Sequence, residues 1–434
     1  MQAVVDYEIK NSVKNKLDKS DREFHDWYRF VLSYPPQLVR KYIKEFNLTS
    51  EDIILDPFCG TGTTLIEAKL QNIPSIGIEA NHFVHLASTV KTNWDVDSIA
   101  LLNCAKIINN NTLRKLGKHK IADNPTLNSG PFLNLRKLNE EQEKLIIKNS
   151  ISPLPLHKSL VLLDEIEKYK STSFYKYFVI AFGNSLVNQV SNLRFGPEVG
   201  VGKIKKDAFV VSTWFKQVQI ICEDIQFSNG KRFAESESIF SDSRNIKNLL
   251  NGRKISAVIT SPPYPNEKDY TRTTRLESVL LGFINSKEEL RGLKKSLLRS
   301  NTRGIYKGDN DDEYVKGFPE IQRIACEIES KRIELGKTSG FERLYHKVTK
   351  LYFGGITKHL IELQSVLKPN AQLAYVVGDQ ASYLRVLIPT GRLIAEIAES
   401  VGYELERIDL FRTRYSTATK TYLNEEVVVL RWRG

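Results

Sequence analysis

The feature that most constrains the fold is the stretch from residue 55 to residue 64, which reads Leu-Asp-Pro-Phe-Cys-Gly-Thr-Gly-Thr-Thr. An apolar run precedes it, and residues 63–70 have the composition of a helix start. The pattern therefore predicts a strand, a tight glycine turn and a helix. Such a turn points backbone N–H groups and the positive end of a helix at a ligand. Gly60 and Gly62 suit it because a side chain there would block close approach or be strained at positive φ.

The residues around the turn separate the ligand classes that use such a loop. A phosphate-binding P-loop requires a lysine after its last glycine, and none follows here. The nicotinamide-type fingerprint requires a third glycine where Leu65 stands. A second predicted strand, residues 75–78, ends in Glu79, and a carboxylate at that place suits a ribose diol. An ordinary turn between strand and helix stays the alternative.

A second motif follows another apolar run, residues 255–259. The chain continues as Thr260-Ser261-Pro262-Pro263-Tyr264. Two consecutive prolines cannot continue a sheet ladder or enter a helix interior, so they hold the chain as a stiff turn at the end of the predicted strand. In isolation, Ser-Pro-Pro-Tyr is also typical of a loop or a proline-rich ligand.

Taken together, Asp-Pro-Phe-x-Gly-x-Gly and Ser-Pro-Pro-Tyr resemble motifs I and IV of the S-adenosylmethionine-dependent DNA amino-methyltransferases. These enzymes methylate an exocyclic nitrogen of cytosine or adenine. The resemblance covers residues 21–95, residues 237–264 and the strands from residue 372. It implies an α/β fold with a Rossmann-like class I methyltransferase sheet, mostly parallel, with an antiparallel C-terminal hairpin and helical insertions. Because the glycine turn precedes Ser-Pro-Pro-Tyr, the chain looks like a permuted relative with a large insert.

The resemblance also implies a role for each motif residue. The Ser261 hydroxyl and the Pro262 carbonyl would accept hydrogen bonds from the target amine, and the Tyr264 ring would stack on a base extruded from duplex DNA. Pro263 completes that catalytic motif. The methyl group would pass directly to nitrogen, with no covalent intermediate. The implied S-adenosylmethionine contacts are Tyr34, Pro35, Asp56, Phe58, Gly60, Thr61, Gly62, Thr63, Thr64, Glu79 and Asp242.

Two of these contacts also have plainer interpretations. The prolines and the predicted helix of residues 37–46 resemble motif X, which closes over the methionine end of the cofactor, but a capped helix covering the sheet fits equally. Asp242 resembles motif III, whose carboxylate accepts from the cofactor adenine. It could also cap a helix over residues 245–250, and the two roles are compatible.

The substrate base and the reaction class leave alternatives open. Serine at position 261 favours N4-methylcytosine over N6-methyladenine as the product. A tRNA guanine-N2 methyltransferase and an inactive DNA-binding subunit remain competing hypotheses. None of the four cysteines follows a proline, so a cytosine carbon-5 mechanism is excluded, and their scatter argues against a zinc site. We expect no metal, and we expect buried thiols of a cytosolic protein.

The charge of the chain fits a nucleic-acid partner, and its hydropathy bears on where the protein is found. The formal net charge of +12 favours a polyanion. With no run of eighteen apolar residues and no leader pattern, we expect neither a membrane span nor secretion, and a cytoplasmic, nucleoid-associated protein of a prokaryote. At family level we expect a cognate restriction endonuclease acting on the same site.

The length of 434 residues suits two to three domains. The predicted catalytic domain comprises residues 21–95, 237–285 and 349–434. Amphipathic stretches predict a helical insertion over residues 96–236, with helices at 140–148, 158–168 and 174–193. A second insertion spans residues 286–348, and either insertion could hold target recognition.

Basic side chains in three segments are candidates for DNA contact. Two lie within the segment after Tyr264. Others lie in the loop of residues 194–206, for which a solvated hairpin is the alternative, and in a predicted loop of residues 412–420. The candidates are Arg194, Lys203, Lys205, Lys206, Arg272, Arg275, Arg412 and Arg414.

Overall fold

A computed structural model describes residues 17, 21–29, 33–129, 131–196, 198–416 and 419–434. The charged stretch before residue 20, which we expected to be frayed, lies outside these residues apart from Leu17. The same holds for residues 30–32 in the segment that resembles motif X. Within the described residues, no helix is long and apolar enough to cross a membrane.

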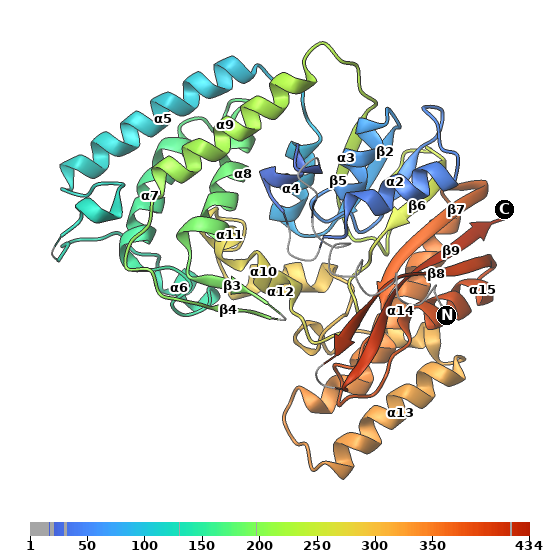
Figure 1. The fold of residues 1–434 in the computed structure, drawn as a ribbon. Helices are drawn as coiled ribbons and strands as arrows, with labels where there is room; N and C mark the ends of the chain where they lie inside the picture. Colours follow the sequence, from blue (N-terminus) through green and yellow to red (C-terminus); the bar gives the residue numbers. More distant parts are fainter. Residues whose placement is uncertain (1–16, 18–20, 30–32, 130, 197, 417–418) are drawn as a thin grey trace, which may run out of the picture.

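The centre of the fold is a seven-stranded sheet with the order β5-β2-β1-β6-β7-β9-β8 (Figure 1). The first five strands in this order run parallel, and β9 pairs antiparallel with both β7 and β8. The predicted sheet, mostly parallel with an antiparallel terminal hairpin, is therefore confirmed. The strands are β1 (Ile54–Asp56), β2 (Ser75–Glu79), β5 (Ser236–Phe240), β6 (Ile255–Thr260), β7 (Leu367–Gly378), β8 (Tyr403–Ser416) and β9 (Thr421–Trp432).

Helices cover both faces of this sheet because successive strand residues point to opposite sides. On one face, α2 (Pro36–Glu45) packs Tyr42 and its neighbours against Ile54, Ile259 and Val376. On the other face, α14 (Tyr345–Gln364) and α15 (Thr390–Ser400) share a core with Leu55, Val258 and Tyr375. The helix α3 (Thr63–Leu70) follows the glycine turn, and α4 (His82–Lys91) follows β2.

The first insertion forms a helical body beside the sheet (Figure 1). Its apolar core includes buried residues of α4 and of α11, so α11 packs with this body although we assigned it to the catalytic domain. The predicted helix 174–193 is too long, because the chain passes through a π-helix into a strand at residue 193. The elements are α5 (Ser98–Lys118), η3 (Pro125–Leu127), α6 (Glu140–Leu145), α7 (Pro153–Glu167), α8 (Tyr175–Ser185), η4 (Leu186–Val190), β3 (Leu193–Phe195), β4 (Val199–Val201) and α9 (Val211–Ser228).

The second insertion docks on α14 through closely packed backbone. At Gly354 of α14, an added Cβ would lie 1.8 Å from the carbonyl oxygen of Asp311. Only glycine allows that approach. The elements of this part of the chain, with the two short helices that precede it, are α10 (Tyr270–Thr273), α11 (Arg275–Leu280), α12 (Lys287–Ser296), η5 (Thr302–Gly304), η6 (Asp311–Val315), α13 (Pro319–Glu334) and η7 (Glu342–Leu344). Near the N-terminus, η2 (His25–Trp27) packs against α8 and α9.

Three local predictions are wrong. Residues 245–250 form turns rather than a helix. Residues 412–416 belong to β8, which continues because β9 pairs with it as far as Ser416. The cysteines are also not all buried, since Cys104 is half-buried and Cys326 lies exposed on α13.

Candidate active site

The glycine turn and the Ser-Pro-Pro-Tyr turn leave neighbouring strands at the same edge of the sheet. The strands β1 and β6 are parallel, with Leu55 opposite Val258. The Thr260 hydroxyl at the end of β6 donates a hydrogen bond of 2.6 Å to Oδ1 of Asp56 at the end of β1. Two motifs about 200 residues apart in sequence are therefore joined by a direct contact.

Asp56 is the anchor of the glycine turn. Its Oδ2 accepts hydrogen bonds from the Thr64 hydroxyl at 2.6 Å and the Tyr34 hydroxyl at 3.1 Å, and its Oδ1 also accepts from the Phe58 backbone N–H at 3.1 Å. Burial raises the pKa of Asp56, while these donors and Thr260 lower it. The carboxylate is fully buried and is occupied by the chain's own donors. These contacts fix the conformation of the glycine turn.

The glycines adopt the backbone conformation that the turn demands. Gly60 has φ of 51° and Gly62 has φ of 85°, so both lie in the region that favours glycine. A Cβ added at Gly60 would meet no heavy atom within 4 Å, whereas at Gly62 it would lie 3.2 Å from the Ser88 Cβ. There is thus open space in front of Gly60, while Gly62 packs against α4. Thr61 is buried in the turn, and Thr63 begins α3.

Glu79 ends β2 beside this turn. It is half-buried, and its Oε1 accepts a 2.7 Å hydrogen bond from the Asn81 backbone N–H. Burial raises the pKa of Glu79 to about 7, against the lowering effect of the backbone N–H groups of Asn81 and Gly60. A carboxylate therefore faces the ligand side of the glycine turn at the expected place.

The segment that resembles motif X reaches the same turn. Tyr34 contacts Asp56 and the Thr64 hydroxyl, and Pro35 is buried directly before α2. Phe58 points the other way across the edge, where its ring meets His359 with centroids 5.0 Å apart.

Ser261 is held in a defined orientation. Its hydroxyl donates a 3.0 Å hydrogen bond to the Val376 carbonyl of β7. Because a hydroxyl has one proton and two lone pairs, its oxygen can still accept, and the Tyr264 hydroxyl lies within hydrogen-bonding reach of it. Pro262 is buried and Pro263 half-buried. Ser261 can thus serve as an acceptor for an amine.

Tyr264 is fixed from both sides. Its backbone N–H donates to the Tyr270 hydroxyl at 3.0 Å. Its ring lies over Gly378, where an added Cβ would be 3.1 Å from the ring. Burial raises the pKa of Tyr264 above its ordinary value, so the ring stays neutral. The ring offers a rigid aromatic face beside Ser261.

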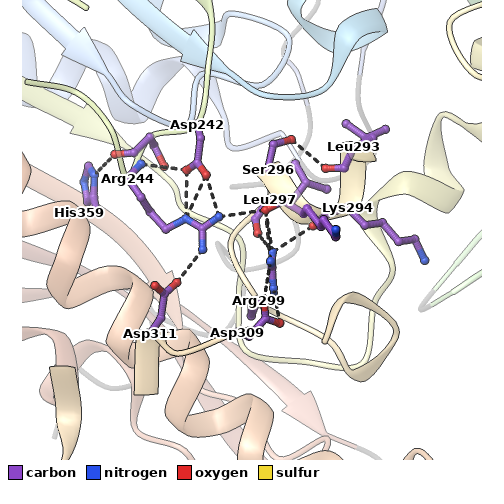
Figure 2. A network of polar contacts seen from close by, with 12 residues as sticks. Asp242, Arg244, Leu293, Lys294, Ser296, Leu297, Arg299, Asp309, Asp311 and His359 are labelled. Carbon is purple, nitrogen blue, oxygen red and sulfur yellow. Dashed lines mark hydrogen bonds and ion pairs between the residues drawn. The ribbon is translucent and has the colours of Figure 1, made fainter. Parts of the chain in front are cut away.

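Asp242 follows β5 and takes part in a network of ion pairs (Figure 2). Its carboxylate accepts from the backbone N–H of Arg244 at 2.9 Å, from Nε at 3.0 Å and from Nη2 at 2.7 Å. Nη1 of the same guanidinium donates to Asp311 at 2.6 Å. The predicted helix cap is wrong, because residues 245–250 form turns and no helix directly follows Asp242. The contacts of Arg244 tie the cofactor edge to the second insertion.

Comparisons with known proteins identify a related family. A family model described as DNA methylase matches residues 6–89. The Type II methyltransferase M.BsoBI of Geobacillus stearothermophilus is 26% identical over 432 residues, covering 92% of this chain and 82% of that protein. M.AvaI of Nostoc sp. is 22% identical, covering 91% and 82%. The comparisons support the DNA amino-methyltransferase family.

Two further matches are more distant. A tRNA (guanine(10)-N2)-dimethyltransferase of Methanocaldococcus jannaschii is 31% identical over 182 residues, which is 39% of this chain and 45% of that protein. The crystal structure of TrmN from Thermus thermophilus covers 95% of this chain and 52% of that chain at 9% identity, with a TM-score of 0.30.

The amino-methyltransferase family implies S-adenosylmethionine as the methyl donor. The residues present fit it. The glycine turn has open space at Gly60, and the half-buried Glu79 carboxylate stands beside it.

The basic residues expected to contact DNA fall into two groups. Arg194, Lys203 and Lys206 are exposed on or beside the β3–β4 hairpin, and their contact with DNA stays a prediction. Lys205 does not reach outward, because its Nζ donates to the Gln189 and Ser191 carbonyls at 2.7 Å.

The remaining four candidates are arginines that contact other residues of the protein to different extents. Arg275 is buried and donates to the Leu145 carbonyl and to Thr271, so its prediction is wrong. Arg412 is paired with Glu425 at 2.5 Å. Arg414 donates to the Asp379 carbonyl and to Gln380. Arg272 stays half-buried, 4.0 Å from Glu198.

Sequence reasoning missed Thr260, Tyr270 and Arg244. Thr260 directly precedes Ser-Pro-Pro-Tyr, and a hydroxyl at the end of a strand beside a buried carboxylate was a usable signal. No local pattern could identify Arg244, because its partner Asp311 is 67 positions away.

Proposed function

We propose that this chain transfers the methyl group of S-adenosylmethionine to the exocyclic N4 of a cytosine flipped out of duplex DNA. The observation that carries the proposal is the orientation of Ser261, whose proton is committed to the Val376 carbonyl. The bound cofactor supplies an electrophilic methyl group. The similarity to Type II methyltransferases supports DNA as the substrate.

The exocyclic amine of the target base is a poor nucleophile, and the residues of this chain have to activate it. The lone pair of an exocyclic amine is delocalised into the ring, so the amine must be held close and its protons drawn to acceptors. In the proposal, the Ser261 hydroxyl oxygen and the Pro262 carbonyl accept hydrogen bonds from the amine N–H groups, and Tyr264 stacks on the base. The C–N bond forms as the C–S bond of the sulfonium breaks to leave a thioether, and the extra proton of the methylated amine passes to solvent. Positioning then supplies most of the rate enhancement, while flipping costs a few kcal/mol that contacts in the pocket offset.

N6-adenine is the alternative target, since its amine presents the same donors. Serine rather than aspartate at position 261 supports cytosine. Duplex DNA treated with tritiated cofactor and then hydrolysed should release labelled N4-methylcytosine. Label confined to N6-methyladenine would reject the base assignment and leave the reaction class intact.

The match to the archaeal tRNA methyltransferase favours testing a second substrate. Transfer to tRNA with none to duplex DNA would refute the proposed substrate. We further propose that a cognate endonuclease acts on the same site, because the relatives are Type II methyltransferases. Methylation-sensitive long-read sequencing of DNA from cells expressing the chain would give the base and the recognition sequence together.

A further inference from the structure

The segment after Tyr264 lies between two hairpins. Residues 195, 196, 198 and 199 of the β3–β4 hairpin line one pocket with residues 268–270, 272 and 273, and Arg303 of the second insertion completes it. On the other side, Arg414 and Glu425 of the β8–β9 hairpin are close enough to influence the charge of Lys268. Figure 1 shows the β3–β4 hairpin pointing toward β8 and β9.

Lys268 is one of the cations that line this pocket, which we call the cleft. Its side chain is half-buried, and its Nζ makes no hydrogen bond or ion pair with any residue that the structure describes. Burial lowers the pKa of Lys268 and the charge of Arg414 lowers it further, against smaller raising effects of Glu425 and Glu198. A half-buried charge without a close partner is costly.

Of the carboxylates near Lys268, Glu198 lies on the pocket wall 4.0 Å from Arg272. The other three are engaged elsewhere. Glu267 accepts from the hydroxyl and backbone N–H of Thr302. Asp269 accepts from Lys294 at 2.7 Å. Glu425 is held by Arg412 at 2.5 Å.

Two further cations lie on the pocket wall. Arg303 stacks on the Phe341 ring at 5.2 Å and has no ion pair among the described residues. Arg272 has Glu198 at 4.0 Å. The cleft therefore collects three cations whose charges are incompletely balanced, which fits an anion supplied by a ligand.

The cleft is rigidly joined to the catalytic turn. The Tyr264 carbonyl accepts from the Asn266 backbone N–H at 2.8 Å, and the Asn266 side chain accepts from the Lys268 N–H at 3.0 Å. Tyr270 closes the same turn through its bond to Tyr264. Lys268 is thus held within a few residues of the ring proposed to stack on the base.

We propose that Lys268, supported by Arg272 and Arg303, binds the backbone phosphate adjoining the flipped nucleotide. This inference rests on the proposed function and adds a positioning site to it. A cation at this place would hold the sugar-phosphate chain while the base lies against Tyr264. An ammonium suits the role because it binds phosphate as a point charge.

The first test measures DNA binding by Lys268→Met across salt concentrations. Its plot of log K against log salt should be shallower than that of the wild type by about 1, as expected for the loss of one phosphate contact. Cofactor affinity by calorimetry should not change, and Lys268→Arg should restore most of the binding. The control is Lys254→Met, whose ammonium is exposed and bound to the Ser365 carbonyl, and its slope should equal that of the wild type.

The second test neutralises the phosphate instead of the protein. Duplexes carrying one methylphosphonate on either side of the mapped target base remove one charge at a time. At one of these positions, the wild type should bind the modified duplex on the order of tenfold more weakly than the unmodified one, which corresponds to the loss of about one charge-assisted contact. Lys268→Met should bind the two duplexes equally. Equal losses for both proteins at every position would overturn the assignment.

The outcomes separate the two levels of inference. Methyl transfer to DNA by the wild type, combined with an unchanged salt slope in Lys268→Met, refutes the phosphate site alone. No transfer to any DNA refutes the proposed function and this site with it. A melting temperature equal to that of the wild type ensures that a loss of binding is not a loss of folding.

Discussion

At the scale of single residues, the Ser261 hydroxyl is oriented by the hydrogen bond that it donates to the Val376 carbonyl, and its oxygen is left to accept. Ser261→Ala should therefore reduce the rate of methyl transfer roughly 10- to 100-fold, the worth of about 1.5–3 kcal/mol for a hydrogen bond to a group that becomes charged. Cofactor affinity should stay unchanged. Single-turnover kinetics measures the first and calorimetry the second. Ser365→Ala, which removes an exposed hydroxyl bound to Glu362, is the matched control.

Glu79 makes cofactor affinity depend on pH. Burial raises its pKa to about 7 in the cofactor-free protein, and the ionised form is the better acceptor for two ribose hydroxyls. We expect S-adenosylmethionine to bind more weakly as pH falls below about 7. In calorimetric titrations from pH 5.5 to 8.5, Glu79→Gln should bind weakly at every pH. A wild-type affinity that does not vary over this range would contradict the role.

The raised pKa of Glu79 also makes the stability of the cofactor-free protein depend on pH, but in the opposite direction to cofactor affinity. Because the pKa of Glu79 in the folded state lies above its ordinary value of 4.5, its contribution to stability is complete below pH 4.5 and is lost as pH rises through about 7. Glu79→Gln should therefore stabilise the cofactor-free protein at pH 8, by at most about 3 kcal/mol. Urea unfolding at pH 5 and pH 8 measures the difference.

How much of the site could be predicted depends on how local each contact is. Gly60 and Glu79 were identifiable because a turn and a strand end are local patterns. Lys205 and Arg275 were not, because their donors point to carbonyls that only the folded chain brings near. Charge in a sequence does not say which way a side chain turns.

At the scale of elements, the contact between Thr260 and Asp56 joins β1 to β6. Thr260→Val keeps the shape and removes the donor, leaving Oδ1 with the Phe58 N–H alone. The free energy of unfolding should fall by about 1–3 kcal/mol, as for a buried group that loses a partner. Thr126→Val removes a hydroxyl from the short helix η3, bonded only to Asn124, and should have little effect in the same assay.

Gly354 fixes the place of the second insertion on α14. In Gly354→Ala, the new methyl group would overlap the Asp311 carbonyl, so we expect destabilisation of about 1–3 kcal/mol, as in other overpacked sites. Gly292→Ala in α12 meets no atom within 4 Å and should be neutral or slightly stabilising, because alanine favours helix. Denaturant unfolding of both variants gives the comparison.

The elements predicted best are those whose beginning and end are both marked by neighbouring residues in the sequence. The helix of residues 63–70 and the strand of residues 75–79 have the predicted bounds. Residues 245–250 read as a helix, but the chain forms turns there. Residues 412–416 read as a loop because they are polar, and pairing with β9 decides otherwise.

At the scale of the whole molecule, the motifs predicted a mostly parallel sheet with an antiparallel terminal hairpin, which the structure has. The packing of the insertions could not be read in this way, because helical periodicity shows which face is apolar and not what covers it. The close backbone contact at Gly354 is visible only in the assembled fold.

The pairing of β1 with β6 also has a consequence for biosynthesis. The partner of Ile54 is Ala257, so β1 cannot pair with β6 until the ribosome has added some 200 further residues. At 5–20 residues per second, this synthesis takes roughly 10–40 s. During that interval one edge of the nascent sheet is open, and open edges recruit other strands. Translation halted within the first insertion should therefore yield aggregates, which sedimentation of ribosome-released fragments ending before and after β6 would reveal. The order of the motifs along the chain thus leaves this edge of the sheet uncovered until β6 has been made.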